Sequence, residues 1–171
     1  MKFYAHYYNI FPKGFEFSSM EEYEQQFQHH QNAIGKLGEN LKTEWVQLIS
    51  SNFIDEKLFN LLKIDKSNLP LFIEKANQWS EQDKINLLIA VGEQRCDFDL
   101  SKDTPSDFDI EVCDTVNSMQ EFAEKLLKDG YLGEIPQSLK PYLDYDEIIA
   151  DILKEYAVLA LYDKLVMYRR K

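Results

Sequence analysis

The chain has 171 residues, of which 44% are hydrophobic and 13% aromatic, enough to form a core in one medium domain or in two to three small subdomains. Thirty acidic residues against nineteen Lys and Arg give a formal charge of −11, which repels nucleic acid and argues against direct DNA or RNA binding. No apolar run approaches the ~20 residues of a membrane span. The N-terminal residues lack the pattern of a secretory signal, so a cytoplasmic protein is expected.

The first fifty residues predict strands around one long helix. Residues 2–8 are rich in aromatic side chains and suit a strand, and residues 15–17 suit a second strand after the turn at Pro12-Lys13-Gly14. Residues 43–49, TEWVQLI, fit either a strand or a short helix.

The helix between these strands is expected over residues 20–34. Ser18 or Ser19 caps it in a capping-box pattern with Glu21 or Glu22. The inner face is formed by Tyr23, Phe27 and Ile34, and the helix is broken by Gly35 and Gly38.

From Asp55 the apolar residues follow a helical period. One short helix is expected around Leu58, Leu61 and Leu62, a second over residues 69–79, and a third from Ser80 to Gly92. Helices of this length are not stable in isolation, so packing against one another must hold them.

The next segment is acidic and irregular. From Glu93 to Glu124 there are ten acids and two bases, Arg95 and Lys102. The alternation of Phe108, Ile110 and Val112 with acids suggests a strand with one wet, acidic face.

The remaining residues predict two helices and a strand pair. Ser118 caps a helix that ends at Gly130, and Asp144 or Asp146 begins another that runs to about Glu155. The tail VLALYDKLVMYRR predicts a strand or a hairpin centred on Asp163-Lys164. Together these elements predict an α+β fold, an elongated chain of three small subdomains: a mixed N-terminal one (1–54), a helical one (55–93) and an acidic α+β one (94–171).

Sequence motifs for catalysis are few. The chain has no nucleophile elbow, Gly-rich phosphate loop or Cys–His–acid signature. The adjacent His29 and His30 point about 100° apart on a helix and cannot chelate one metal ion together, and His6 falls in a predicted strand. Cys96 and Cys113 lack metal-type spacing and are expected to be free thiols.

A magnesium site is the strongest enzymatic alternative. Its ligands would be Asp97, Asp99, Asp107, Asp109 and Glu111, because alternating carboxylates on a strand share one face. Such a hydrolase also needs cations to hold phosphate, and the nearby bases are just Arg95 and Lys102. We therefore expect no enzyme and no cofactor.

The stretch from Met119 to Asp151 resembles the C-terminal block of the ArdA-type antirestriction proteins. The matching elements are a helix that ends at Gly130, the Gly133-Glu134-Ile135-Pro136 turn with Leu139, and Tyr142-Leu143-Asp144-Tyr145 before an acidic helix. The basic end at Arg169, Arg170 and Lys171 departs from the family's pattern.

The resemblance implies a small protein of mobile elements that evades host defence by imitating DNA. It would occupy the basic DNA-binding groove of a type I restriction–modification enzyme, or of another nucleic-acid-binding target such as a CRISPR effector, and it would act as a homodimer. The predicted partner-binding acids form two rows: Asp103, Asp107, Asp109, Glu111, Asp114, Glu121 and Glu124, and on the last helix Asp144, Asp146, Glu147, Asp151 and Glu155. Taken singly, each acid is more simply explained as part of a solvated surface, and it is the set that favours function.

Overall fold

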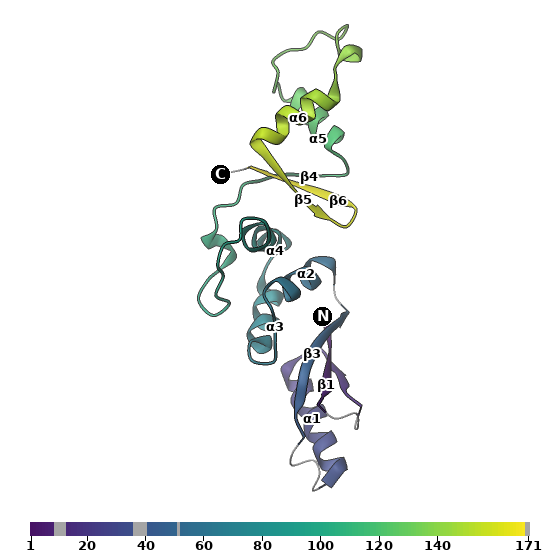
Figure 1. Ribbon diagram of the computed structural model, residues 1–171, viewed down its shortest axis with the longest axis vertical. Coiled ribbons are helices and arrows are strands. Elements are labelled where there is room, and N and C mark those ends of the chain that lie inside the picture. The colour runs from purple at the N-terminus through teal and green to yellow at the C-terminus, as the bar shows by residue number, and fades with distance from the viewer. Residues whose placement is uncertain (9–12, 36–40, 51, 170–171) are drawn as a thin grey trace. The chain divides into compact units, whose positions relative to one another are not determined.

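The computed structural model describes residues 1–8, 13–35, 41–50 and 52–169, and the chain divides into two compact units, residues 1–108 and 109–171. Helices and two three-stranded antiparallel sheets confirm the α+β class (Figure 1). The boundary predicted between residues 54 and 55 falls inside the first unit, and the threefold division stays a prediction. The break predicted at Gly38 lies outside the described residues.

The first unit begins with the sheet β2-β1-β3, made of β1 (Lys2–Tyr7), β2 (Phe15–Phe17) and β3 (Thr43–Ser50). The segment that fitted either a strand or a helix is therefore a strand, because its backbone pairs with β1 from Thr43 to Ser50. A side chain at Gly14 would lie 2.0 Å from the carbonyl oxygen of Ala5, so glycine is needed where β2 approaches β1.

Helix α1 (Met20–Ile34) lies against one face of this sheet (Figure 1). Of the two predicted caps, Ser19 is used: its side chain accepts a hydrogen bond from the Glu22 amide, and the Glu22 carboxylate accepts one from the Ser18 amide. The buried Tyr23 ring packs on Phe15 and Phe17 of β2, which fixes α1 on the inner face.

Three helices follow, as predicted: α2 (Phe53–Leu61), α3 (Leu69–Gln78) and α4 (Glu81–Leu87), the last continued by a π-helical segment, Leu88–Glu93. The Ser80–Asp83 capping box is confirmed. Helix α2 starts two residues before the apolar period, because the Asn52 side chain accepts a hydrogen bond from the Asp55 amide.

A line of four phenylalanine rings joins the sheet to these helices. Phe3 of β1 stacks on Phe17 at 5.4 Å between centroids and lies 6.1 Å from Phe59 of α2, which meets Phe72 of α3 edge-on at 5.8 Å. All four side chains are less than 9% exposed. These rings make a continuous core through the strands and helices of the first unit.

The second unit contains the sheet β4-β6-β5, formed by β4 (Val112–Val116), β5 (Tyr156–Leu161) and β6 (Lys164–Arg169), with α5 (Met119–Lys128) and α6 (Tyr145–Glu155). Its buried cluster joins residues of both helices and the sheet: Val116, Phe122, Ala123, Ile152, Tyr156 and Met167. Each helix thus turns an apolar stripe toward the sheet.

The strand predicted around Phe108–Val112 is wrong. Pro105–Asp107 form a 3-10 turn capped by Thr104, and pairing with β6 begins at Val112. The Asp107 carboxylate accepts a hydrogen bond from the Thr104 amide, so it closes this turn and does not face outward from a strand.

The remaining boundaries agree with the sequence. Helix α5 ends in a Schellman motif: the Tyr131 amide donates to the Leu126 carbonyl, the Gly130 amide donates to the Leu127 carbonyl, and Gly130 has φ +89°. Asp144, not Asp146, caps α6. The tail is a hairpin that turns at Tyr162-Asp163. Cys96 and Cys113 are both free thiols.

A buried ion pair holds α2 to α4. The Lys84 ammonium lies 2.7 Å from Asp55 Oδ1, with side chains 12% and 8% exposed. Among the described residues, no group donates a well-aligned hydrogen bond to that oxygen, so the pair is held by charge. We expect Asp55→Ala to lower the free energy of unfolding by roughly 3 kcal/mol, because it leaves a buried cation without its partner.

Urea unfolding followed by tryptophan fluorescence measures this loss in the first unit, since the chain's two tryptophans, Trp45 and Trp79, both lie there. The control is Asp55→Leu with Lys84→Met, which removes both charges and should recover most of the stability. Equal losses in the single and double variants would contradict the ion-pair explanation.

His30 makes the first unit sensitive to acid. Burial raises the pKa of Tyr7 to about 12, so its hydroxyl stays protonated, and it shares a hydrogen bond with Nδ1 of His30, 2.9 Å away. Burial, and then the neighbouring His29, lower the pKa of His30 below its ordinary 6.5.

Neutral His30 therefore stabilises the fold above pH 6.5, and this contribution is lost as the pH falls through the lowered pKa of the folded state. We expect the free energy of unfolding to decrease from pH 6.5 to 5 and this decrease to become smaller in His30→Asn, which keeps an acceptor but does not titrate. Unfolding by urea at each pH measures it. An unchanged pH dependence in the variant would show that His30 is not the responsible group.

Candidate functional site

The predicted first row of acids is divided between the two units. Asp103 and Asp107 belong to the first unit, and the acids from Asp109 to Glu124 belong to the second. One continuous row through both stays a prediction.

In the first unit, Asp103 and Asp107 stabilise local turns. The Asp103 carboxylate accepts a hydrogen bond from the Asp99 amide at 2.7 Å, and Asp107 caps the 3-10 turn. Asp99 in turn binds Lys102 at 2.6 Å, and hydrogen bonds from Lys102 and Ser101 hold its pKa well below the usual range. The hydrogen-bonding capacity of these carboxylates is thus partly used within the chain.

A single lysine neutralises two acids of the first row. The Lys125 ammonium lies 3.0 Å from Asp114 and 3.3 Å from Glu121. The pKa of Glu121 is lowered first by hydrogen bonds from Asn117 and then by Lys125, and the pKa of Lys125 is raised, chiefly by Asp114. Glu121 also helps to begin α5, because its carboxylate accepts from the Asn117 amide while Ser118 caps the helix. These two acids have the clearest structural role of the row.

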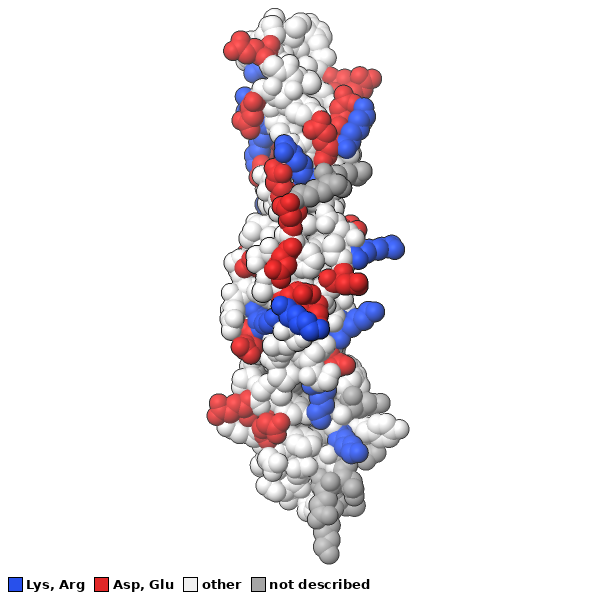
Figure 2. Space-filling model, turned by 90° about the vertical axis from the view of Figure 1, so that its left-hand side faces the viewer, with Lys and Arg blue, Asp and Glu red and all other residues white. Residues whose placement is uncertain are grey.

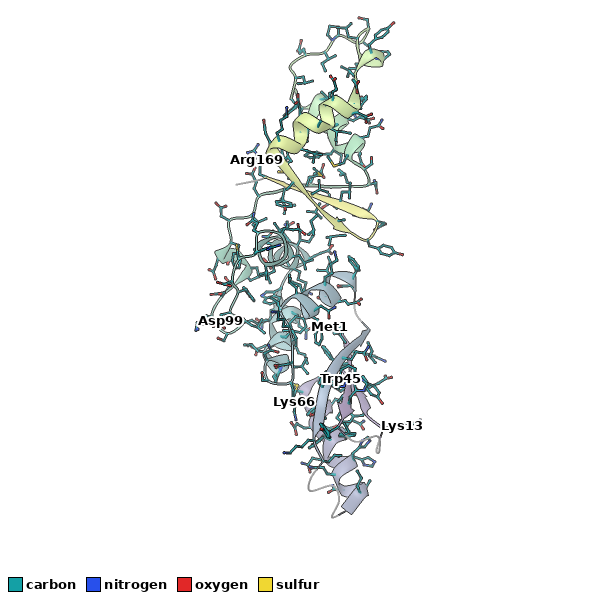
Figure 3. All side chains as sticks on the ribbon, in the orientation of Figure 1. Met1, Lys13, Trp45, Lys66, Asp99 and Arg169 are labelled. Carbon is teal, nitrogen blue, oxygen red and sulfur yellow. The ribbon has the colours of Figure 1, made fainter. Side chains whose placement is uncertain are left out.

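Glu111 is paired at the end of the sheet. The Arg169 guanidinium lies 3.3 Å from Glu111 and 5.8 Å from the centroid of the Tyr156 ring (Figure 3). A hydrogen bond with Tyr156, and then the charge of Glu111, raise the pKa of Arg169. Arg169, near the C-terminal end, thus neutralises an acid of the predicted row.

Helix α6 carries the second row. Asp144 caps the helix by accepting hydrogen bonds from the amides of Asp146 and Glu147. Glu147, Asp151 and Glu155 follow at four-residue intervals, so they lie on one side of the helix at about 6 Å of axial rise per step. All three are exposed.

Few of the α6 acids are paired with bases. Asp151 pairs with Lys154, which raises the pKa of that lysine. Within the described part of the chain, no Lys or Arg lies within ion-pair distance of Asp146, Glu147 or Glu155. Asp146 and Glu147 also stabilise the positive N-terminal end of the helix. The α6 row is therefore the least neutralised of the predicted sets.

Acids and bases are mixed over much of the surface. Figure 2 shows Lys and Arg atoms among the Asp and Glu atoms on the face that it presents. Electrostatic attraction to a partner therefore depends on acids whose charge is not cancelled by a neighbour.

The magnesium alternative gains no support from the geometry. Among the described residues, no three His, Cys, Asp or Glu side chains are grouped so that they could hold a metal ion. The expected alternation of Asp107, Asp109 and Glu111 on a strand face is lost, because the strand starts after them. No helix in the described ranges is long and apolar enough to cross a membrane.

The segment between α5 and α6 encloses a pocket of about 620 Å³. Its lining combines apolar side chains with two lysines and two glutamates: Glu124, Leu127, Lys128, Gly130, Gly133, Glu134, Ile135, Lys140, Leu143 and Tyr145. The same segment exposes Leu132, Leu139 and Tyr142, at 53%, 52% and 84%. No sequence motif predicts this pocket, because the residues that line it are spread from Glu124 to Tyr145 and meet only in the folded chain.

The neutralising bases were also missed, although part of the signal was in the sequence. Glu121–Lys125 and Asp151–Lys154 have the spacing of helical ion pairs. The pairing of Arg169 with Glu111 has no such signal, because strand register brings together residues 58 positions apart.

Comparison with protein families gives a match to the antirestriction protein (ArdA) model over residues 3–163. The chain belongs to the ArdA family. No curated protein and no solved structure matches it. The match extends through both units, whereas the resemblance in the sequence lay within the C-terminal third, from Met119 to Asp151. ArdA proteins are antirestriction proteins that inhibit type I restriction enzymes, and the family consists of inhibitors, not enzymes.

Proposed function

We propose that this ArdA protein inhibits its target by presenting carboxylates in place of DNA phosphates, so that it occupies the basic DNA-binding groove of a type I restriction–modification enzyme. The observation that carries the proposal is the α6 row, in which Glu147, Asp151 and Glu155 repeat along one exposed helix side with little neutralisation. The acids of the first row add negative charge, but ion pairs with Lys125 and Arg169 reduce the charge that they present to a partner.

The charge of the chain sets the length of DNA that it would replace. Duplex DNA carries about two charges per base pair, so a net charge of −11 matches about five or six base pairs. A homodimer would match about eleven, close to one turn of the duplex. Exposed ion pairs contribute ~0–1 kcal/mol each, so tight binding has to come from many of them acting together.

A homodimer is therefore part of the proposal. The exposed Leu132, Leu139 and Tyr142 offer an apolar surface for it, and the two lysines and two glutamates of the adjacent pocket are suited to pair with their own symmetry mates. A basic groove in another defence protein, such as a CRISPR effector, would attract the same acids. The target is therefore tested directly with a purified type I methyltransferase core.

Neutralising the α6 row should weaken inhibition. We expect Glu147→Gln, Asp151→Asn and Glu155→Gln together to raise the Kd for the methyltransferase core about tenfold at low salt, at up to ~1 kcal/mol per lost pair. The Kd of the wild type should rise steeply with salt, and that of the variant less steeply, because fewer counterions are exchanged. Calorimetry at two salt concentrations measures both.

The matched control removes three exposed acids of the first unit that lie outside the predicted rows, by Glu24→Gln, Glu74→Gln and Glu93→Gln. It changes the net charge by the same amount and should leave the Kd within about twofold of the wild type, as expected for screened charges away from the contact. An equal rise in Kd for both triple variants would mean that the core is attracted by the overall negative charge and not by a defined row of acids. Wild-type binding that does not change with salt would count against DNA mimicry.

The dimer is tested by sedimentation at micromolar concentration. Leu132→Ser with Leu139→Ser should shift the protein to monomer, because it removes the apolar contact. Tyr8→Ser, which removes an even more exposed side chain in the first unit, should not. Far-UV circular dichroism checks that each variant is folded. A monomeric wild type would refute the dimer but leave the α6 test intact.

A further inference from the structure

The sheet of the first unit carries an exposed stack of rings on its outer face. His6 and Trp45 face each other across β1 and β3, and their rings stack with centroids 3.6 Å apart and planes 9° from parallel. The Tyr4 ring contacts His6 at 4.6 Å. Figure 3 places Trp45 on β3, and we call Tyr4, His6 and Trp45 the outer stack.

The outer stack is separate from the core. Side chains alternate along β1, so Phe3, Ala5 and Tyr7 are buried toward the helices while Tyr4 and His6 point to the opposite face. Trp45 remains 47% exposed, and Ile49 on the same strand 41%. Large apolar side chains gathered on one exposed face are typical of an interaction surface.

The chemistry of the stack selects a cation. The faces of aromatic rings attract cations, and tryptophan does so most strongly. Glu16 of β2 is exposed and pairs in register with Tyr4, which places a carboxylate on the same face as the rings. The chain's charge of −11 brings basic surfaces toward it and repels anions such as nucleic acid.

Among cationic side chains, arginine fits best. Its flat guanidinium stacks on a ring while its N–H groups remain free to bind a carboxylate, whereas the lysine ammonium is a compact and strongly hydrated charge. We propose that the outer stack docks an arginine of the basic protein partner on the exposed face of Trp45. This inference rests on the proposed function, and it adds a contact in the first unit that depends on a ring and not on an acidic row.

The first test uses Trp45 as its own reporter. In full-length Trp79→Phe, Trp45 is the remaining tryptophan. We expect octa-arginine to change its emission at a concentration about threefold lower than octa-lysine, the preference that one exposed ring contact would give. Peptide binding is followed in parallel by the anisotropy of labelled peptide.

Three results would overturn the proposal. The first is octa-arginine binding without a change in Trp45 emission. The second is equal effective concentrations of the two peptides, which would indicate charge attraction alone. The third is an emission change with protein concentration in the absence of peptide, which would indicate that a second copy covers this face.

The second test measures binding of the methyltransferase core to Trp45→Leu at two salt concentrations. We expect a Kd about threefold higher at both, because the lost ring carries no charge and no counterion is exchanged. Trp45→Tyr, which keeps a ring, should restore most of the affinity. The matched control, Tyr162→Leu, removes an exposed ring of the second unit and should bind like the wild type.

The two proposals fail in different ways. If Trp45→Leu binds as tightly as the wild type while the α6 triple variant is weakened, the outer stack is not a docking site and DNA mimicry stands. If the α6 variant binds normally and Trp45→Leu does not, the acidic row is wrong and the stack stands. Urea midpoints of all variants confirm that the changes do not come from unfolding.

Discussion

The apolar cluster between α5, α6 and the sheet β4-β6-β5 determines where the charge of the second unit lies. Phe122 and Ile152 are almost completely buried in it, so each helix has one orientation in which its apolar stripe is removed from water. The acids of both helices are then forced to the opposite side. On α6, this places Glu147 and Asp151 in line on the exposed side of the helix. The hydrophobic core thus arranges an electrostatic surface.

Carboxylates in this protein have structural roles that compete with the partner binding that we propose for them. Asp107 and Asp144 end or begin elements by accepting backbone hydrogen bonds, and Asp114 is bound to Lys125. Each such internal partner reduces the electrostatic potential that a basic ligand meets. The acids most available to a partner are those, such as Glu147, whose surroundings contain no described base. This difference explains why the number of acids alone is a poor guide to an inhibitory surface.

The first unit is organised by aromatic rings on both faces of its sheet. Phe3 and Phe59 belong to the inner line of rings that joins strands to helices, and Trp45 with His6 forms the exposed stack on the other side. The same period-two alternation of β1 generates both, since successive side chains point to opposite faces. One surface stabilises the fold, and the other is the one on which we propose that a partner docks. The family match covers this unit as well as the acidic one.

Local patterns in the sequence were enough to predict the α+β class, most helix boundaries, the Ser80 and Ser118 caps and the glycine at the end of α5, because each depends on residues within one or two turns of each other. The acidic strand around Phe108 was misplaced, since a capping aspartate outweighed the alternation. The sequence did not predict which acids remain unpaired or which rings meet across the strands. Both depend on contacts between residues distant in the chain, such as Glu111 with Arg169. Coulomb attraction and ring stacking depend on distance in space, and strand register and helix packing set that distance in the folded chain alone.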